Sequence, residues 1–336
     1  MPIVDIHAET SRQAKGRGVL GDAYLALKAG LRELACGRMF RDRAHFVRMT
    51  KKGRWLLLKH MGLNEVVLPF LEDMRLCAST DDNVVACDVY IDGHFGYPQF
   101  ACALEHLQRL DYFARQRPLF FDIGANIGTH SLYALRSELF SRVVSVEPEP
   151  GNFQLLVRNL RMNGFDAGNA LNVGLSDRSG QAILQLSDDN MGDHRVVSDA
   201  GARAATDRTR SIVLKDFAAV SRELQLDLRD GAFFWIDTQG HEFQVLRGIE
   251  AELLRTNAFA VEFWPTLLRR NGTLEAFLEL ARATASGYIV LQEGRTIVDM
   301  KELDALASHL IGQPYPADQL DLLFLGTAAP LRAPGN

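Results

Sequence analysis

The run from Leu119 to His130, LFFDIGANIGTH, constrains the fold more than any other part of the chain. In it an apolar segment ends at Asp122, a tight turn with two glycines follows, and a helix can then begin. In an open α/β sheet, this order of strand, turn and helix places the turn at the carboxyl edge of parallel strands, where it cradles a nucleotide-like ligand. The run therefore predicts a cofactor-binding turn.

The chemistry of this turn favours one cofactor over another. Its pattern is D-x-G-x-N-x-G, whereas a dinucleotide needs three glycines so that its pyrophosphate can lie on the helix N-terminus. Asp122 would repel a pyrophosphate and attract an amino group or a sulfonium. Gly124 and Gly128 allow close backbone approach, and Asn126 suits a turn and donates hydrogen bonds. We expect S-adenosyl-L-methionine (SAM) rather than NAD; an ordinary turn without a ligand is the plainer alternative.

From residue 118 onward, strand-like and helix-like segments alternate. The expected strands are 119–123, 143–147, 170–175, 232–237, 258–263, 287–292 and 321–326, and the expected helices are 129–139, 151–162, 240–254 and 273–285. This alternation predicts an α/β, Rossmann-like doubly wound domain with a largely parallel, seven-stranded sheet. Two more β-prone pieces, 181–186 and 211–215, flank a polar stretch, 187–210, that we expect to be a mobile loop over the site.

The chain before residue 118 divides into two parts. Residues 1–80 have apolar residues near helical spacing and predict a mainly helical N-terminal extension, a cap or interaction module. Residues 81–117 form a lead-in, in which 84–91 is β-prone and Asp92-Gly93 is a favourable turn before a helix. Residues 118–330 then form the cofactor-binding domain.

Charge and cysteine content limit the classes of function. The net charge of −5 argues against general nucleic-acid binding. The basic stretch 38–54, with Arg41, Arg43 and Lys51, is typical of a solvated helical face; contact with anionic lipid or an acidic glycan is the alternative. Four cysteines without metal-ligand spacing indicate free thiols in a reducing compartment. With no evident signal peptide and no membrane span, we expect a cytoplasmic protein.

Polar residues after the next two strands would complete the cofactor site. Glu147 ends the second strand, at the distance from the turn where a carboxylate accepts hydrogen bonds from two ribose hydroxyls. The third strand leads to Leu175, Ser176 and Asp177. Leu175 would flank the adenine ring, and Ser176 or Asp177 would bind its exocyclic amine. A plain turn suits these two polar residues equally well.

Candidates for proton transfer lie at the ends of the fourth and fifth strands. Asp237 follows an apolar strand and would face the same crevice as Asp122 and Glu147. His241 lies in the next helix's first turn, where the helix dipole favours the neutral imidazole that a general base needs; a capping histidine is the alternative. Glu262 ends the fifth strand at the same edge. No metal-binding cluster is evident.

Taken in order, these runs resemble the FkbM family of SAM-dependent methyltransferases. The family pattern joins a D-x-G-A-N-x-G turn, an E-P strand end, a helix with spaced asparagines, an L-S-D segment followed by glycine, an I-D-x-E-G-x-E run and a late glutamate before a hydrophobic residue. The matching residues are Asp122 to Gly128, Glu147-Pro148, Asn159 with Asn163, Leu175-Ser176-Asp177 with Gly180, Ile236 to Glu242, and Glu262-Phe263. The resemblance covers about residues 118–265 and implies a class I methyltransferase fold.

The resemblance also implies O-methylation of a hydroxyl on a sugar, glycan or natural-product acceptor. Such a reaction needs alignment of the acceptor oxygen with the methyl carbon, and a base for the proton. The candidates for that base are His241, Asp237 and Glu262, in this order. Two positions depart from the family pattern: Trp235 stands where lysine is usual, and Gln239 where glutamate is usual. A catalytically inactive SAM-binding protein and an NAD-linked oxidoreductase are therefore the alternatives.

Overall fold

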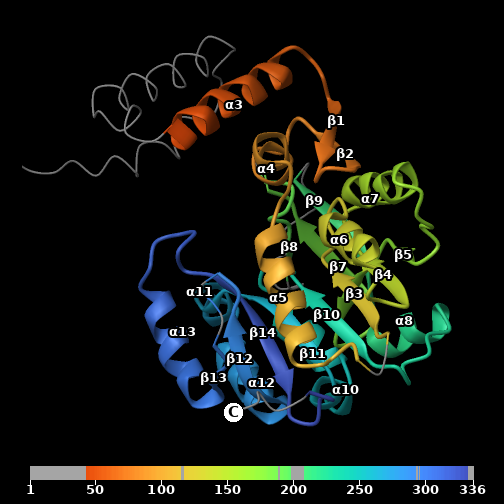
Figure 1. Cartoon of the computed structure of the whole chain (residues 1–336), viewed down its shortest axis with the longest axis vertical. Coiled ribbons are helices and arrows are strands. Elements are labelled where there is room, and N and C mark those ends of the chain that lie inside the picture. Colours follow the sequence, from red (N-terminus) through yellow and green to blue (C-terminus); the bar gives the residue numbers. More distant parts are fainter. Residues whose placement is uncertain are drawn as a thin grey trace, which may run out of the picture.

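An eight-stranded sheet forms the centre of the computed structural model, which describes residues 43–114, 117–187, 190–197, 208–292, 294 and 296–331 (Figure 1). Its strands, in spatial order, are β13 (Val298–Asp299), β12 (Ala285–Val290), β14 (Leu320–Gly326), β11 (Ala258–Phe263), β10 (Ala232–Ile236), β3 (Leu119–Ile123), β4 (Arg142–Val146) and β5 (Ala170–Leu171). The five strands from β11 to β5 run parallel, and β14 is antiparallel to both of its neighbours. The predicted Rossmann-like α/β fold is confirmed; the two-residue β13 is the strand beyond the expected seven.

The central strands form because their apolar residues can be buried on both faces. All residues of β3 and β10 are buried, as expected of strands in the middle of a parallel sheet. Since side chains alternate along a strand, Phe120 and Phe233 lie in one apolar core, whereas Phe121 and Phe234 lie in the other. The sheet therefore separates two hydrophobic cores.

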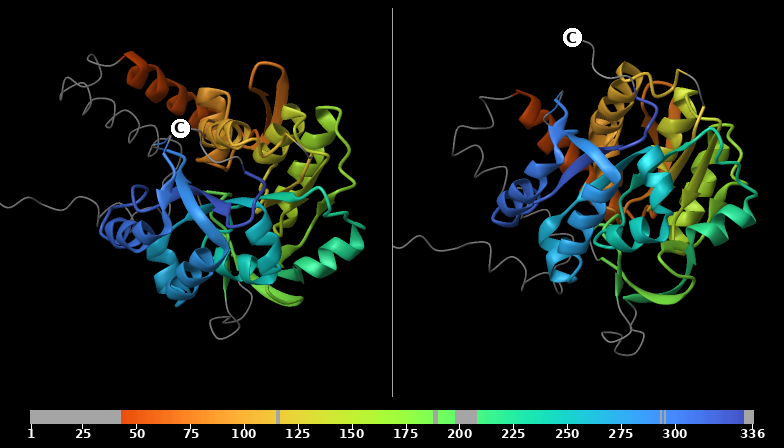
Figure 2. Two further views of the ribbon diagram at one scale, coloured as in Figure 1. Left: turned by 60° about the horizontal axis from the view of Figure 1, so that its bottom comes forward. Right: turned by 90° about the horizontal axis from the view of Figure 1, so that it is seen from below.

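Helices cover both faces of the sheet (Figure 2). The core that contains Phe120 is closed by α5 (Tyr97–Arg109), α6 (Thr129–Ser137) and α7 (Pro150–Met162). The core that contains Phe121 is closed by α8 (Phe217–Glu223), α9 (Glu242–Gly248), α10 (Ala251–Thr256), α11 (Pro265–Arg270), α12 (Leu274–Thr284) and α13 (Leu303–Ile311), with the 3₁₀ helix η2 (Met300–Glu302) before α13. The expected helix 240–254 is thus two short helices, α9 and α10.

A second, four-stranded sheet lies at one end of the main sheet. Its order is β6 (Gly174–Ser176), β9 (Thr209–Asp216), β7 (Gly180–Gln185) and β8 (Arg195–Val197). The two β-prone pieces expected beside the polar stretch correspond to β7 and β9. The expected strand 170–175 is divided, because its first residues extend the main sheet as β5 and its last residues pair with β9.

The prediction of a strand at 84–91 is wrong, because this segment is the helix α4 (Val85–Asp92). The carboxylate of Asp82 accepts hydrogen bonds from the backbone N–H groups of Val84, Val85 and Ala86. It thereby satisfies donors that a helix start leaves open. Gly93, with a φ of 79°, ends the helix in the left-handed conformation instead of forming a hairpin turn.

The described part of the N-terminal extension is not all helical. Helix α3 (Arg43–His60) agrees with the expectation, but β1 (Glu65–Phe70) and β2 (Met74–Ser79) form an antiparallel hairpin. Residues 1–42, with the apolar segment 22–34 and Arg41, lie outside the described residues. In the described part of the chain, Cys77, Cys87 and Cys102 form no disulfide bond. Within the described ranges, no helix combines the length and the apolar character needed to cross a membrane.

Two asparagines, Asn159 in α7 and Asn163 at its C-terminal cap, attach this hairpin to the main domain. Asn163 accepts a hydrogen bond from the backbone N–H of Arg75 and donates one to its carbonyl. Asn159 does the same for Cys77 and also donates to the carbonyl of Ile127 in the glycine turn. The spacing fits, since four residues of helix rise about 6 Å and two residues of strand about 6.6 Å. One face of the helix thus takes the place of a third strand.

Candidate functional site

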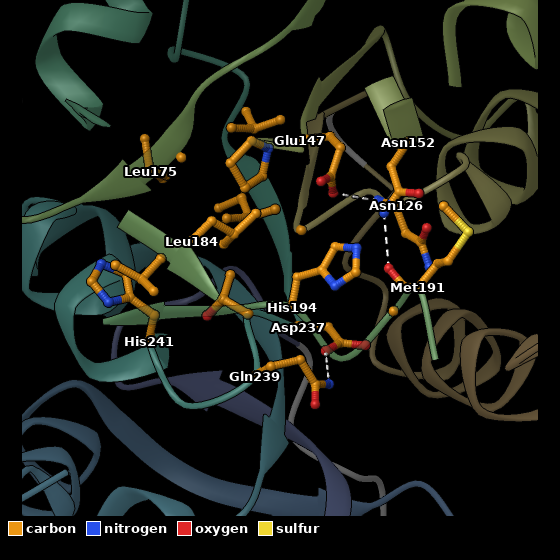
Figure 3. Close-up of a pocket in the computed structure, with 18 residues that line it drawn as sticks. Asn126, Glu147, Asn152, Leu175, Leu184, Met191, His194, Asp237, Gln239 and His241 are labelled. Atoms are coloured by element: carbon orange, nitrogen blue, oxygen red, sulfur yellow. Dashed lines mark hydrogen bonds between the residues drawn. The ribbon is translucent and has the colours of Figure 1, made fainter. Parts of the chain in front are cut away.

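A pocket opens at the carboxyl ends of β3, β4 and β10, the edge that the sequence predicts (Figure 3). Its cavity volume is about 50 Å³, and the space inside the pocket and its open mouth together is about 530 Å³. Of the predicted residues, six line it: Gly124, Asn126, Glu147, Leu175, Asp237 and His241. Asp122, Gly128, Ser176, Asp177 and Glu262 lie outside its lining.

Gly124 and Gly128 each allow a different close contact of the turn. Gly124 has a φ of 84°, and a Cβ there would lie 1.8 Å from the carbonyl oxygen of Asp237. Only glycine therefore allows the turn to meet the end of β10. Gly128 has a φ of 93°, and a Cβ there would lie 2.5 Å from a methyl carbon of Leu156. Gly128 thus allows α7 to pack closely against the turn.

Asp122 lies beneath the pocket and not on its wall. Its side chain is buried and accepts a hydrogen bond of 2.5 Å from the hydroxyl of Ser131, whose oxygen lies 2.7 Å from that of Ser145. Burial raises the pKa of Asp122 to about 7. The carboxyl group therefore joins β3, α6 and β4 below the turn, and direct contact with a cofactor cation is not what this geometry favours.

Glu147 faces the pocket from the end of β4. One carboxylate oxygen accepts a hydrogen bond of 2.8 Å from the backbone N–H of Asn126, and the other accepts one of 2.8 Å from that of Glu149. Burial raises the pKa of Glu147 to about 8. The two hydrogen bonds fix both oxygens in place, and each oxygen keeps a lone pair for a further donor.

The segment expected beside adenine is split between two cavities. Leu175 lines the pocket, whereas Ser176 and Asp177 line a neighbouring cavity. The hydroxyl oxygen of Ser176 lies 2.9 Å from Nε2 of His241. Asp177 forms an ion pair with Arg247.

His241 stands apart from the other polar groups of the pocket. In Figure 3 it lies toward the side of Leu184, away from Asn126 and Asn152. Burial lowers the pKa of His241 to about 4, so its imidazole is neutral near pH 7. The predicted neutral form is thus present, but the cause is burial more than a helix dipole.

Asp237, Gln239 and Glu262 form a connected group where β10 and β11 end. The amide nitrogen of Gln239 donates hydrogen bonds of 2.8 Å to Asp237 and 2.6 Å to Glu262. Burial raises the pKa of both carboxyl groups, and the neighbouring Asp237 carboxylate raises that of Glu262 further. Glu262 keeps a proton, because two negative charges would otherwise be buried side by side. Asp237 is therefore the better proton acceptor.

The pocket is completed by residues that the sequence did not single out. The described part of the polar stretch, 190–197, supplies Met191, Gly192, His194 and Val196. The amide of Asn152 in α7 donates a hydrogen bond of 2.8 Å to the carbonyl of Met191 and holds this segment. The prediction that this stretch lies over the site is supported by these residues; 188, 189 and 198–207 lie outside the described residues. No motif marks these residues; only their place in a polar stretch pointed to them.

Trp264 directly follows β11 and does not line the pocket. It is buried, donates a hydrogen bond of 2.7 Å to Asp318 and carries the guanidinium of Arg195 over its ring at 5.0 Å. Among the described residues, no three His, Cys, Asp or Glu side chains are grouped to hold a metal ion.

Comparison with known proteins adds an independent line of evidence. A model of the methyltransferase FkbM domain matches residues 122–283. The chain is 30% identical to the methyltransferase sdnD of Sordaria araneosa over 190 residues, which is 48% of this chain and 72% of that protein. The solved structure of precorrin-6y C5,15-methyltransferase from Geobacter metallireducens is 14% identical with a TM-score of 0.29, over 66% of this chain and 86% of that one. The strand order of the main sheet identifies the fold without that likeness.

Proposed function

The chain belongs to the FkbM methyltransferase family, and we propose that it transfers a methyl group from SAM to a hydroxyl of a sugar, glycan or natural-product acceptor. The observation that carries this proposal is the single pocket that brings the Gly124 turn, Glu147 and Asp237 together at the carboxyl edge of the sheet. It joins groups suited to an adenosyl cofactor with a carboxylate suited to accept a proton.

The polar groups of the pocket fit SAM. Glu147 offers two fixed oxygens to the vicinal ribose hydroxyls. The side-chain oxygens of Asn126 and Asn152 are buried and have no hydrogen-bond partner among the described residues, and a buried acceptor of this kind needs a donor. The amino group of the cofactor supplies such a donor. Leu175 and Leu184 form an apolar wall for the adenine ring. When bound, SAM provides a methyl carbon that its sulfonium already activates.

We assign the proton acceptor to Asp237 instead of His241. Asp237 lines the pocket and is oriented by Gln239, while Glu262 beside it holds a proton. His241 is engaged by Ser176 and lies toward the Leu184 side, so it serves better as a wall. A general base must lie within hydrogen-bond reach of the proton that it removes. Asp237 meets this condition for a methyl-acceptor hydroxyl that binds next to Gln239.

The two alternatives make different predictions. An NAD-linked oxidoreductase needs room for a pyrophosphate at the turn, where Gly124 meets the end of β10. An inactive SAM-binding protein keeps the pocket but lacks a working base, and Gln239, which stands where the family pattern has glutamate, is the feature that favours it. The hydrogen bonds from Gln239 to both carboxylates support a working site. The cytoplasmic location stays a prediction.

Titration calorimetry with SAM and S-adenosylhomocysteine, with NADH in parallel, tests the cofactor. Both adenosyl ligands are expected to bind, and Glu147→Gln is expected to weaken them about tenfold or more, since it replaces one of the two carboxyl oxygens that face the ribose hydroxyls with an NH₂ donor. The surface change Glu279→Gln serves as the control and leaves affinity unchanged. Absence of adenosyl binding in folded protein would overturn the proposal.

Turnover is tested with SAM that carries a deuterated methyl group and a panel of hydroxyl acceptors, read by mass spectrometry. Asp237→Asn is expected to abolish methyl transfer and to retain S-adenosylhomocysteine binding. His241→Ala is expected to retain transfer if the assignment to Asp237 is right. Tight cofactor binding without transfer to any acceptor would favour the inactive binding protein.

A further inference from the structure

A second cavity adjoins the cofactor pocket and has a different character. Its volume is about 570 Å³, and it lies beside β6, β7 and the start of α9. His241 and Val196 line both cavities and so belong to the wall between them. We name it the arginine cavity, because Arg178, Arg247 and Arg270 line it.

The charge of the arginine cavity is positive. Among its described lining residues, Asp177 is the only carboxylate, and it is paired with Arg247. Arg178 and Arg270 are exposed and form no ion pair with another side chain of the described ranges. Two guanidinium groups are thus left to attract an anion. Because guanidinium groups match the oxygens of phosphate in pairs of hydrogen bonds, phosphate is the anion that they recognise best.

An unpaired acceptor in the same cavity adds a second requirement. The amide oxygen of Gln244 is buried and has no hydrogen-bond partner within the described residues. An anion alone cannot satisfy an acceptor, so the occupant must also carry a donor such as a hydroxyl. Asn271 also lines the cavity; its amide nitrogen donates to the carbonyl of Gly240, which leaves its amide oxygen to accept from a further hydroxyl.

We propose that the arginine cavity is a second binding site, which takes a small phosphorylated molecule that carries hydroxyl groups, of the sugar-phosphate class. Its phosphate lies between Arg178 and Arg270, and a hydroxyl donates to Gln244. This site does not depend on the proposed methyl transfer, because its residues, apart from the shared wall, are not those of the cofactor pocket.

The test is titration calorimetry without SAM, using inorganic phosphate, glucose 1-phosphate and glucose as probes. Glucose 1-phosphate is expected to bind more tightly than phosphate, and glucose is expected not to bind. The double variant Arg178→Gln/Arg270→Gln is expected to weaken glucose 1-phosphate at least tenfold. Gln244→Leu is expected to remove the advantage of glucose 1-phosphate over phosphate.

Two control variants separate this site from a general charge effect and from the cofactor pocket. Arg269→Gln removes one positive charge next to Arg270, on the helix α11, from a residue that does not line the cavity, and is expected to leave binding unchanged. Glu147→Gln alters the cofactor pocket and is expected to leave phosphate-ester binding unchanged. The proposal is overturned if wild-type protein binds none of the phosphate probes, if Arg269→Gln weakens binding as much as the double variant, or if only Glu147→Gln changes it.

Discussion

The imidazole of His130 stacks on the indole of Trp235, with ring centroids 4.5 Å apart and ring planes 27° from parallel. Phe100 of α5 contacts both rings. Burial lowers the pKa of His130 to about 3, so the imidazole is neutral near pH 7. Trp235, which departs from the family's usual lysine, is therefore a core residue between β10 and the helices of that face.

The variant Trp235→Lys tests this assignment. Replacing a buried indole by a shorter, charged side chain is expected to lower the free energy of unfolding by about 3 kcal/mol or more. Trp235→Phe keeps an aromatic ring against His130 and is expected to cost less. Urea unfolding measures both. A lysine variant as stable as the wild type would show that the stacked pair does not support the core.

The variant Gly124→Ala tests the contact between the turn and β10. The new Cβ would meet the carbonyl of Asp237, and the backbone φ of 84° is unfavourable for alanine. We expect loss of adenosyl-ligand binding and a lower thermal midpoint. Gly53→Ala is the matched control, since nothing lies within 4 Å of its Cβ and alanine favours the helix α3 by up to about 1 kcal/mol. Equal effects of the two changes would contradict this reading of the turn.

The variant Gln239→Glu restores the residue that the family pattern favours. It replaces a donor shared by Asp237 and Glu262 with a third acid, so we expect a loss of about 1–3 kcal/mol of stability that grows as the pH rises. Gln225→Glu is the control, because Gln225 is exposed and has a similar φ, 49° against 52° for Gln239. Urea unfolding at two pH values compares them. A stabilising effect of Gln239→Glu would show that the amide is not needed between the carboxyl groups.

The stability of the protein without ligand is expected to fall as the pH rises. Burial raises the pKa of Glu147 to about 8, so the folded chain keeps this proton where the unfolded chain has lost it. Protonated Glu147 stabilises the folded chain fully below its ordinary pKa, near 4.5, and this contribution is lost as the pH passes through about 8. Glu147→Gln removes this contribution to the pH dependence of the free energy of unfolding, which is at most about 1.4 kcal/mol per pH unit. Urea unfolding from about pH 5 to pH 8 measures both proteins, and identical slopes would contradict the raised pKa.

The parallel sheet was predictable because its strands are continuous apolar runs between turns. Leu119–Ile123 and Ala232–Ile236 are buried on both faces, so no competing structure suits them. The segment 84–91 was misassigned because its β-branched residues outweigh a helix signal that depends on Asp82, which lies before the segment. Local propensity is weaker than capping and burial in such cases.

The candidate site was predictable where a strand end carries a polar residue. Glu147 and Asp237 line the pocket because the carboxyl ends of parallel strands meet at one edge. Asp122 and Asp177 show the limit of that rule. Asp122 lies on β3 as expected and Asp177 directly follows β6, but Ser131 and Arg247 draw their side chains to other partners. No motif in the sequence marks these partners.

Asn159 of α7 and Asn163 at the end of that helix affect how the molecule meets other chains. A strand edge with open N–H and C=O groups is a template on which a second chain can add a strand. Asn159 and Asn163 occupy these groups at Cys77 and Arg75. The hairpin is thereby protected against β-addition at this edge by two side chains, so the same amides that hold it in place also guard the protein against aggregation.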